Sequence, residues 1–407
     1  MANLKYFLWL TTRKGFRAGE LWELLSRFNS PEAVYYAEGA EYELLGINGV
    51  RRESLTDKDL QGAEKILADC DRLGIHIMTI QDADYPELLG RIDDPPVVLY
   101  WKGKALHVDD KLTVGVVGTR KCTPYGESLA GRLGLELARR GVTLVSGMAE
   151  GIDTAGIKGA LQGGGTIVSV LGGGIDIVYP WRNRWLYEDV AAAGTLISEY
   201  PPGTEHAGHH FPVRNRILSG LSRGVVVVEA GGSSGALISA RAALDQNREV
   251  FAFPGPVGAA ASLGCNRLIQ QGEAKLILSA DDLLEEFTGA LPGEVPQGLP
   301  PMDESTVKER LNVEPVPALS RPEEEKVVDK PPQRAYISLT DDPEVLTEDQ
   351  RDILMAIQHK ALTADDIAEA AQIPAKRVLS ALTMLQLKGW VEEKSGKRFT
   401  AAVIVAP

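Results

Sequence analysis

The sequence has 407 residues and a formal net charge of −13. At roughly 100 to 200 residues per domain, this length predicts two to four domains. No apolar stretch approaches the ~20 residues that a membrane-spanning helix needs, and no signal-peptide pattern opens the chain, so we expect a cytoplasmic protein without a membrane partner. The three cysteines are widely separated, which excludes a disulfide framework and a CxxC metal knuckle.

The negative charge is concentrated in one part of the chain. Residues 281–349 contain 18 acidic and 6 basic side chains (6 − 18 = −12), whereas residues 111–280 contain 16 basic and 13 acidic ones (16 − 13 = +3). Because phosphate binding depends on local clusters of Arg and Lys, the overall acidity does not exclude a nucleic-acid ligand.

Residues 1–80 carry apolar side chains at helical spacing and predict a small helical domain. Within it, the segment 45–50 has two glycines in a pattern typical of a helix-hairpin-helix turn, in which backbone amides approach a DNA phosphate. The motif is short and degenerate, and a plain interhelical turn with a packing role is the favoured interpretation. Both interpretations stay open on the sequence.

Residues 81–288 alternate short apolar strands with amphipathic segments of helical length. This alternation predicts a Rossmann-like, doubly wound and mostly parallel sheet of class α/β. Each strand is followed by glycine or a small polar residue, so the loops gather at the edge where such folds bind ligands. The predicted strands are residues 112–117, 143–145, 166–171, 196–198, 224–229 and 249–253.

The last part of the chain changes composition twice. Residues 289–342 are rich in proline and acidic residues and predict a disordered linker. Residues 343–407 then predict three helices and a hairpin, which is the outline of a winged-helix domain. From 347 to 407 the chain has 8 basic and 8 acidic residues, so we expect protein docking or weak DNA contact there rather than strong duplex binding.

The loops of the central domain carry the features that suit phosphate. The turn Gly118–Arg120 places a glycine and a guanidinium between a strand and the next helix, where free amides can also bind an anion. A GxGxxG fingerprint is absent, which disfavours NAD, and we expect no cofactor and no metal. Three further segments at the same sheet edge suit phosphate: residues 179–185, residues 211–216 and the glycine-rich residues 231–235. Four such features on one edge favour a polymer with several phosphates. The candidate nucleic-acid-binding residues are Gly118, Thr119, Arg120, Ser146, Gly147, Arg182, Asn183, Arg184, Trp185, Arg214, Asn215, Arg216 and Gly235.

Two of these features have structural alternatives. The segment 179–185 interleaves arginines with tryptophans, a combination that can follow a backbone and stack bases, although Trp185 could equally belong to the core. We expect Arg214 and Arg216 to project from the start of a helix toward the Gly118 turn; a structural salt bridge could account for one of them but would hardly need both. The histidines at 206, 209 and 210 cluster in a glycine-containing loop without a recognisable metal-ligand spacing, so we interpret them as surface-loop residues.

The ordered motifs of residues 80–280 resemble those of the DNA-processing protein A family (DprA, also called Smf). The resemblance rests on Val117–Arg120, Ser146-Gly147 with Gly151–Asp153, Ser198–Pro201, Phe211–Arg216 and Phe253–Gly255. The family usually has Ala-His shortly after its Gly-Ile-Asp motif, whereas this chain continues as Thr154-Ala155-Gly156, which puts one local contact in doubt. The family's DNA contacts match Gly118, Arg120, Ser146, Gly147, Arg214, Asn215 and Arg216, with Arg182 and Arg184 in a more variable loop.

The resemblance implies a homodimer that binds single-stranded DNA, protects it and loads the RecA recombinase during natural transformation, without catalysis. Two alternatives remain at this point. A Rossmann-like nucleotide N-glycosidase would use a carboxylate such as Glu229 beside the glycine-rich segment 231–235, although the family motif of such enzymes is incomplete here. A duplex-DNA regulator would act through the winged helix.

Overall fold

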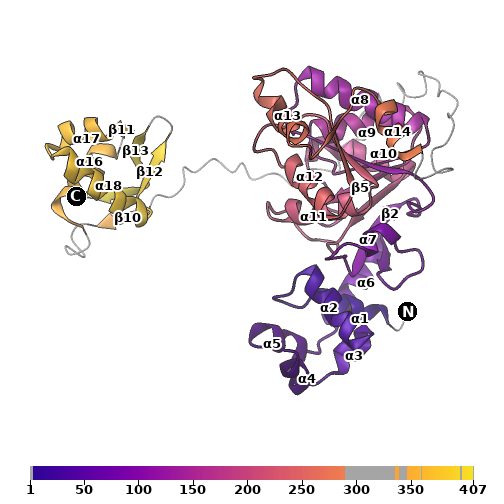
Figure 1. The fold of residues 1–407 in the computed structure, drawn as a ribbon. Helices are drawn as coiled ribbons and strands as arrows, with labels where there is room; N and C mark the ends of the chain where they lie inside the picture. Colours follow the sequence, from indigo (N-terminus) through magenta and orange to yellow (C-terminus); the bar gives the residue numbers. More distant parts are fainter. Residues whose placement is uncertain (1–2, 289–334, 339–345, 359, 395–396, 407) are drawn as a thin grey trace. The chain divides into compact units, whose positions relative to one another are not determined.

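The computed structural model describes residues 3–288, 335–338, 346–358, 360–394 and 397–406. They belong to two compact units, residues 1–315 and residues 316–407, which we describe separately (Figure 1). Of the predicted linker 289–342, only residues 335–338 are among those described. No helix in these ranges has both the length and the apolar character needed to cross a membrane.

The first unit is built on a nine-stranded sheet with the order β1-β2-β6-β5-β4-β3-β7-β8-β9. Strands β3 to β9 pair in parallel, whereas β1 and β2 pair antiparallel at one edge. The six predicted strands are present as β3 to β8, which confirms the mostly parallel, doubly wound sheet. The strands are β1 (His76–Thr79), β2 (Val98–Gly103), β3 (Thr113–Val117), β4 (Thr143–Ser146), β5 (Ile167–Leu171), β6 (Thr195–Ser198), β7 (Gly224–Val227), β8 (Glu249–Ala252) and β9 (Lys275–Leu276).

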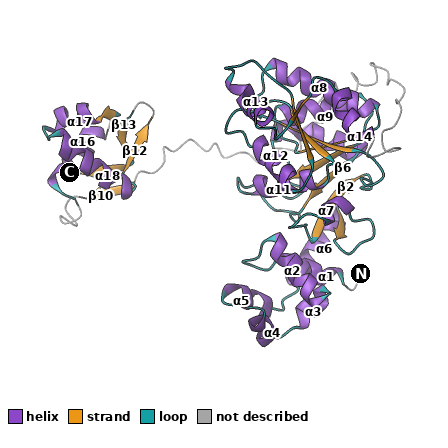
Figure 2. Cartoon of the chain, in the orientation of Figure 1, coloured by secondary structure: helices purple, strands orange, loops and turns teal. Residues whose placement is uncertain are grey.

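Alternating side chains of each strand fill two hydrophobic cores, one on each face of the sheet. In β7, for example, Val226 joins one core, while Val225 and Val227 join the other. Because successive side chains of a strand point to opposite faces, a strand covered on both sides must be apolar throughout. This explains the uninterrupted valine runs, and Figure 2 shows the strands lying between helices.

The helices of the two faces follow from the same pattern. Helices α8, α9 and α10 contribute apolar residues to one core, and α11 and α12 contribute to the other. The helices that follow the sheet strands are α8 (Pro124–Arg139), α9 (Ile152–Gln162), α10 (Arg184–Ala193) after the short 3₁₀ turn η1 (Trp181–Asn183), α11 (His210–Gly220), α12 (Ala236–Asp245), α13 (Leu263–Gln270) after η2 (Ala260–Ser262), and α14 (Ala280–Thr288).

The N-terminal residues are helical, as predicted, up to residue 73. Residues 76–79 instead form strand β1 of the large sheet, and the apolar residues of the N-terminal helices belong to the same continuous core as one face of the sheet. The boundary at residue 80 therefore stays a prediction. The helices are α1 (Leu4–Thr11), α2 (Ala18–Phe28), α3 (Pro31–Tyr36), α4 (Gly39–Leu44), α5 (Val50–Thr56) and α6 (Gln61–Leu73), followed by α7 (Glu87–Gly90) in the connector to β2.

The glycine-containing segment 45–50 joins α4 to α5. Gly46 and Gly49 have φ angles of 75° and 58°, which L-residues rarely adopt, so glycine is needed for this tight interhelical turn. The turn has the predicted conformation, and both its packing role and its DNA role stay open.

The second unit has the predicted three helices and hairpin. Helix α16 (Glu348–Ile357) begins at a capping box, in which the Thr347 hydroxyl accepts a hydrogen bond from the Gln350 amide (3.3 Å). Helices α17 (Ala364–Ala371) and α18 (Ala375–Leu387) follow, and β12 (Val391–Lys394) pairs antiparallel with β13 (Arg398–Ala401). Residues 335–338, predicted as linker, instead form strand β10 and pair with β14 (Val403–Ala406). Strand β11 (Leu362–Thr363) completes the small sheet on β13.

Candidate nucleic-acid interface

The strand order changes direction between β3 and β7, and the loops after these two strands line an open pocket of about 470 Å³. In open α/β sheets, ligands bind at the carboxyl ends of the strands where such a reversal separates the loops. We call this pocket the groove. Six predicted site residues line it: Gly118, Thr119, Arg120, Arg214, Asn215 and Gly235.

The turn after β3 is held at both ends by Glu229, which follows β7. The Thr119 amide donates to the Glu229 main-chain carbonyl (2.8 Å), and the Thr123 amide and hydroxyl donate to its carboxylate (2.8 and 2.7 Å). Glu229 is only 3% exposed. Because this carboxylate binds the N-cap residue of α8, its negative charge disfavours an anion at that helix N-terminus, and the predicted phosphate contact of the turn then depends on Arg120.

Arg120 and Lys121 are both exposed in this turn, and Arg120 is the one that lines the groove. Its guanidinium lies 4.7 Å from the centre of the Phe211 ring, a cation–π contact that orients the side chain without neutralising its charge. Gly118 is needed just before it, since a Cβ at that position would overlap Ile152 of α9. The glycine thus lets α9 approach the strand while the arginine stays at the rim.

Arg214 lies beneath the groove and is only 4% exposed. Its Nη1 donates to the Val170 carbonyl (2.5 Å), and its Nε has no hydrogen-bond partner among residues 3–288. Gly147 makes room for it, because a Cβ there would overlap the guanidinium. A buried guanidinium with one donor left unpaired favours a nearby anionic ligand, since leaving such a group unsatisfied is costly.

Asp153 is the carboxylate with the largest electrostatic effect on Arg214. It accepts hydrogen bonds from the amides of Gly147 (3.1 Å) and Ala149 (3.3 Å). Burial raises the pKa of Asp153 to about 6, although Arg214 and these amides favour its ionised form. The Gly147 amide is therefore already bonded within the protein.

Ser146 is fully buried, and its hydroxyl donates to the Val116 carbonyl (2.8 Å). The structure thus gives Ser146 and Gly147 supporting positions under the groove. A direct contact to DNA from either residue stays a prediction.

Arg216 does not face the groove, contrary to our expectation for the paired arginines. Its guanidinium forms ion pairs with Asp94 (2.9 Å) and Glu199 (2.7 Å). The whole residue is only 8% exposed. Burial alone would lower the pKa of Arg216, but the two carboxylates raise it. Arg216 therefore joins the connector before β2 to the end of β6.

The segment around η1 separates into exposed and structural residues. Asn183 is 5% exposed and donates to the Met148 carbonyl and the Thr154 hydroxyl (both 2.8 Å). Trp185 packs against the core, with Lys158 over its ring at 5.2 Å. Of the two alternatives for Trp185, the structure supports the core position. Arg182 is exposed and Arg184 is partly exposed, and neither lines the groove.

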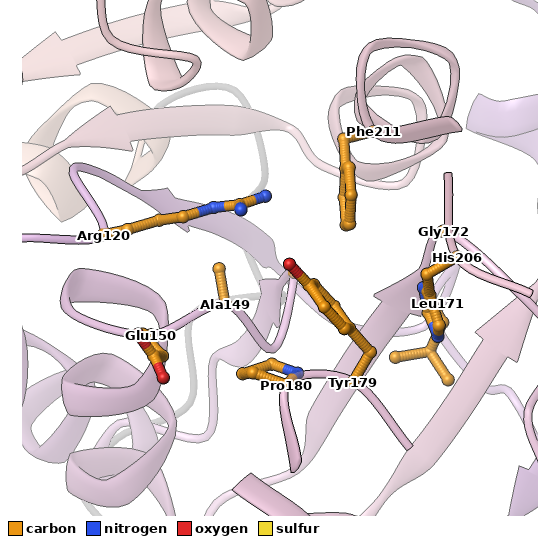
Figure 3. Close-up of a pocket in the computed structure, with 10 residues that line it drawn as sticks. Arg120, Ala149, Glu150, Leu171, Gly172, Tyr179, Pro180, His206 and Phe211 are labelled. Atoms are coloured by element: carbon orange, nitrogen blue, oxygen red, sulfur yellow. The ribbon is translucent and has the colours of Figure 1, made fainter. Parts of the chain in front are cut away.

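A second, smaller pocket of about 90 Å³ adjoins the groove through Arg120. Tyr179 stacks on His206 (ring centres 5.0 Å apart) and contacts Phe211 (5.6 Å). Figure 3 shows Arg120, Tyr179 and Phe211 converging on this pocket from three segments of the chain. Gly147 also lines it, together with Ala149, Glu150, Leu171, Gly172, Pro180 and His206.

Sequence reasoning did not select the aromatic residues of this pocket as site residues. Tyr179 and Phe211 belong to the same short segments, 179–185 and 211–216, as the predicted arginines. This closeness in sequence could have identified them as site residues. His206 bonds the Ile177 carbonyl through Nε2 (2.9 Å). Within the described ranges, no group of three or more His, Cys, Asp or Glu residues is placed to hold a metal ion.

The comparisons with known proteins agree with this architecture. The family model described as DNA recombination-mediator protein A matches residues 76–288, and that of the DprA winged helix domain matches residues 338–397. Protein Smf of Synechocystis is 36% identical over 79% of this chain and 79% of its own length. The chain belongs to the DNA-processing protein A (DprA/Smf) family. The DNA processing protein DprA of Bacillus subtilis is 42% identical over 55% of this chain and 75% of its own length.

Solved structures agree with the sequence comparison. The crystal structure of DprA from Streptococcus pneumoniae superposes with a TM-score of 0.62 at 34% identity, over 69% of this chain and 97% of that chain. The match supports both the sheet and the helices around the groove. As a member of this DNA-processing, recombination-mediator family, the chain is related to DNA-handling proteins rather than to a known family of enzymes.

In the winged helix of this family member, one cation of the third helix is already paired within the protein. Of the three basic residues in and after α18, Arg377 forms a two-point ion pair with Asp349 of α16 (2.8 and 2.7 Å). Because each neutralised cation removes a phosphate contact, this geometry disfavours the duplex-regulator alternative. The N-glycosidase alternative is also disfavoured, since Glu229 is buried and bonded to Thr123.

Proposed function

We propose that this chain binds single-stranded DNA along the groove and acts as a recombination mediator. The observation that carries the proposal is Arg214, a buried guanidinium whose Nε has no hydrogen-bond partner, beneath a pocket whose rim bears the exposed Arg120. Both cations are suited to phosphodiester oxygens. The other predicted site residues act as lining or as support for these two.

A polymer is favoured over a single nucleotide by the length of the lined surface. The groove and the smaller aromatic pocket share Arg120, so one ligand can pass from the first to the second. Phosphates alone would suit the groove, whereas the rings of Tyr179 and Phe211 suit bases. Unpaired bases are accessible to such rings, and paired bases in a duplex are not.

The cellular role that we propose is protection of incoming DNA and transfer to the RecA recombinase during natural transformation, by a homodimer in the cytoplasm and without catalysis. The family description as a recombination mediator supports the recombinase step. The engagement of Glu229 by Thr123 supports a binding protein, because it removes the carboxylate best placed beside the glycine-rich loop. RecA filament assembly on single-stranded DNA, measured with and without the protein, tests this role.

The groove is tested by Arg120→Ala. We expect its affinity for an oligothymidylate to fall about 10-fold, as removal of one charge-assisted hydrogen bond of about 1.4 kcal/mol would give. The dependence of log K on log salt should also become shallower by about 0.7 for each phosphate that the variant no longer neutralises. Fluorescence anisotropy at several salt concentrations measures both quantities.

Arg132→Ala is the matched control. Arg132 is an exposed arginine of α8 that contacts Glu136 at 3.9 Å and lines neither pocket. It should leave the affinity and the salt dependence unchanged. If Arg120→Ala binds as tightly as wild type with the same salt dependence, the groove is not the DNA site.

A further inference from the structure

Trp181 is the one tryptophan of the chain whose side chain is largely exposed. The sequence has six tryptophans, and Trp181 is 52% exposed while the other five are buried or half-buried. Exposing an indole costs free energy because its large apolar surface stays in water. A tryptophan kept at the surface therefore indicates a contact made in a complex.

The surroundings of Trp181 are those of the proposed DNA path. It directly follows Tyr179 and Pro180, which line the aromatic pocket beside Arg120 (Figure 3). Tyr179 is itself 40% exposed, so two aromatic rings stand at the surface within three residues. Trp181 itself lines neither pocket, but it follows in sequence directly after two residues of the aromatic pocket.

The charges beside Trp181 suit a nucleic acid better than an apolar partner. The Arg184 guanidinium lies over the indole ring, 5.4 Å from its centre, and Arg182 is exposed between them in sequence. A cation over one face of a ring leaves the opposite face for a base, and both guanidinium groups can reach phosphates. Trp185, one helical turn later, is packed against the core instead.

We propose that Trp181 is a base-stacking platform, on which an unpaired base of the bound strand lies while Arg182 and Arg184 contact the adjoining phosphates. This inference rests on the proposed single-strand binding and adds a point at which unpaired bases are selected. A duplex keeps its bases stacked on one another, so it cannot use the platform without unpairing.

The test compares two ligands, an oligothymidylate and an abasic oligomer of the same length, on the full chain. Trp181→Ala should bind the oligothymidylate about 5- to 100-fold more weakly, the effect of losing one stacked base, and should bind the abasic oligomer as wild type does. Tryptophan emission of the wild type should change on adding the oligothymidylate but not the abasic oligomer.

Trp181→Phe and Trp185→Phe make the matched pair for the emission change. The first should lose this change while keeping much of the affinity, since phenylalanine retains an aromatic face. The second should keep it, because Trp185 does not meet the strand.

Several results would overturn the platform. These are an unchanged emission response in Trp181→Phe, equal weakening of both oligomers by Trp181→Ala, or an emission shift on dilution of the protein alone, which would assign Trp181 to a contact between copies. If Arg120→Ala weakens binding and Trp181→Ala does not, the groove stands and the platform falls. Absence of binding by wild type would overturn both.

Discussion

The groove and the winged helix both carry arginines, but they use them differently. Helix α18 contributes Arg377, whose guanidinium is paired with both oxygens of Asp349. In the groove, Arg120 is exposed beside an aromatic ring, and Arg214 is buried with its Nε lacking a hydrogen-bond partner. The number of cations in a segment is therefore a poor guide to its phosphate affinity. Affinity depends on whether a carboxylate of the same chain has already neutralised the cation.

The two classes of arginine are those paired with a carboxylate and those that are not. The largest loss of DNA affinity is expected on substitution of Arg214, which belongs to the second class. Arg214→Ala should lower single-strand affinity by more than Arg120→Ala does, because it removes the buried charge and leaves the ionised Asp153 without its nearby cation. Loss of the bond to the Val170 carbonyl should also lower the free energy of unfolding by roughly 1 to 3 kcal/mol. Anisotropy and urea denaturation measure the two effects.

Arg216→Ala is the control for this experiment. Arg216 is similarly buried but paired with Asp94 and Glu199, so its loss should destabilise the protein while leaving the salt dependence of DNA binding unchanged. A shallower salt dependence in Arg216→Ala would show that the paired arginine also binds phosphate, and the distinction would fail.

A smaller effect is expected from the charge of Asp153. Burial raises the pKa of this carboxyl to about 6 from an ordinary value of 3.8, so it becomes neutral as the pH falls through 6. The groove then gains one unit of positive charge, and affinity for DNA should rise by about fivefold, the effect of roughly 1 kcal/mol between charges in water. In Asp153→Asn this part of the pH dependence should be absent.

The same ionisation should affect stability. Because the folded-state pKa lies above the unfolded value, the proton is bound more tightly in the folded state, and stability should decrease as the pH rises from about 4 to about 6. Comparing wild type with Asp153→Asn at each pH isolates the contribution of this carboxyl, because both proteins contain all the other titratable groups. Identical pH profiles would contradict the role given to Asp153.

The smallest effect is expected in the winged-helix unit. Deleting residues 340–407 should leave most of the single-strand affinity, within about threefold, because the paired Arg377 adds little to phosphate binding. Titration of the truncated and full chains with the same oligothymidylate checks this. Loss of binding in the truncated chain would favour the duplex-regulator alternative and reverse the comparison between the two regions.

The strands and the winged-helix outline could be predicted because their signals are local. The apolar runs of β3 to β8 and the cap at Thr347 depend on neighbouring residues only. Which arginines are paired with carboxylates could not be predicted in this way. Arg216, for example, forms ion pairs with Asp94 and Glu199, which are distant in sequence. The same holds for Glu229, whose partner Thr123 lies 106 residues earlier. The sequence motifs therefore located the groove, but they did not show which of its charged side chains are neutralised within the protein.

The double attachment of the β3 turn to Glu229 has a consequence for the thermodynamics of binding. With Thr119 and Thr123 both fixed to the same residue, the backbone that carries Arg120 is already ordered before any ligand arrives. Binding then requires little loss of conformational entropy at this turn, and more of the interaction energy remains as affinity. In the proposed binding mode, Glu229 contributes by preorganisation of this turn and not by contact with a phosphate.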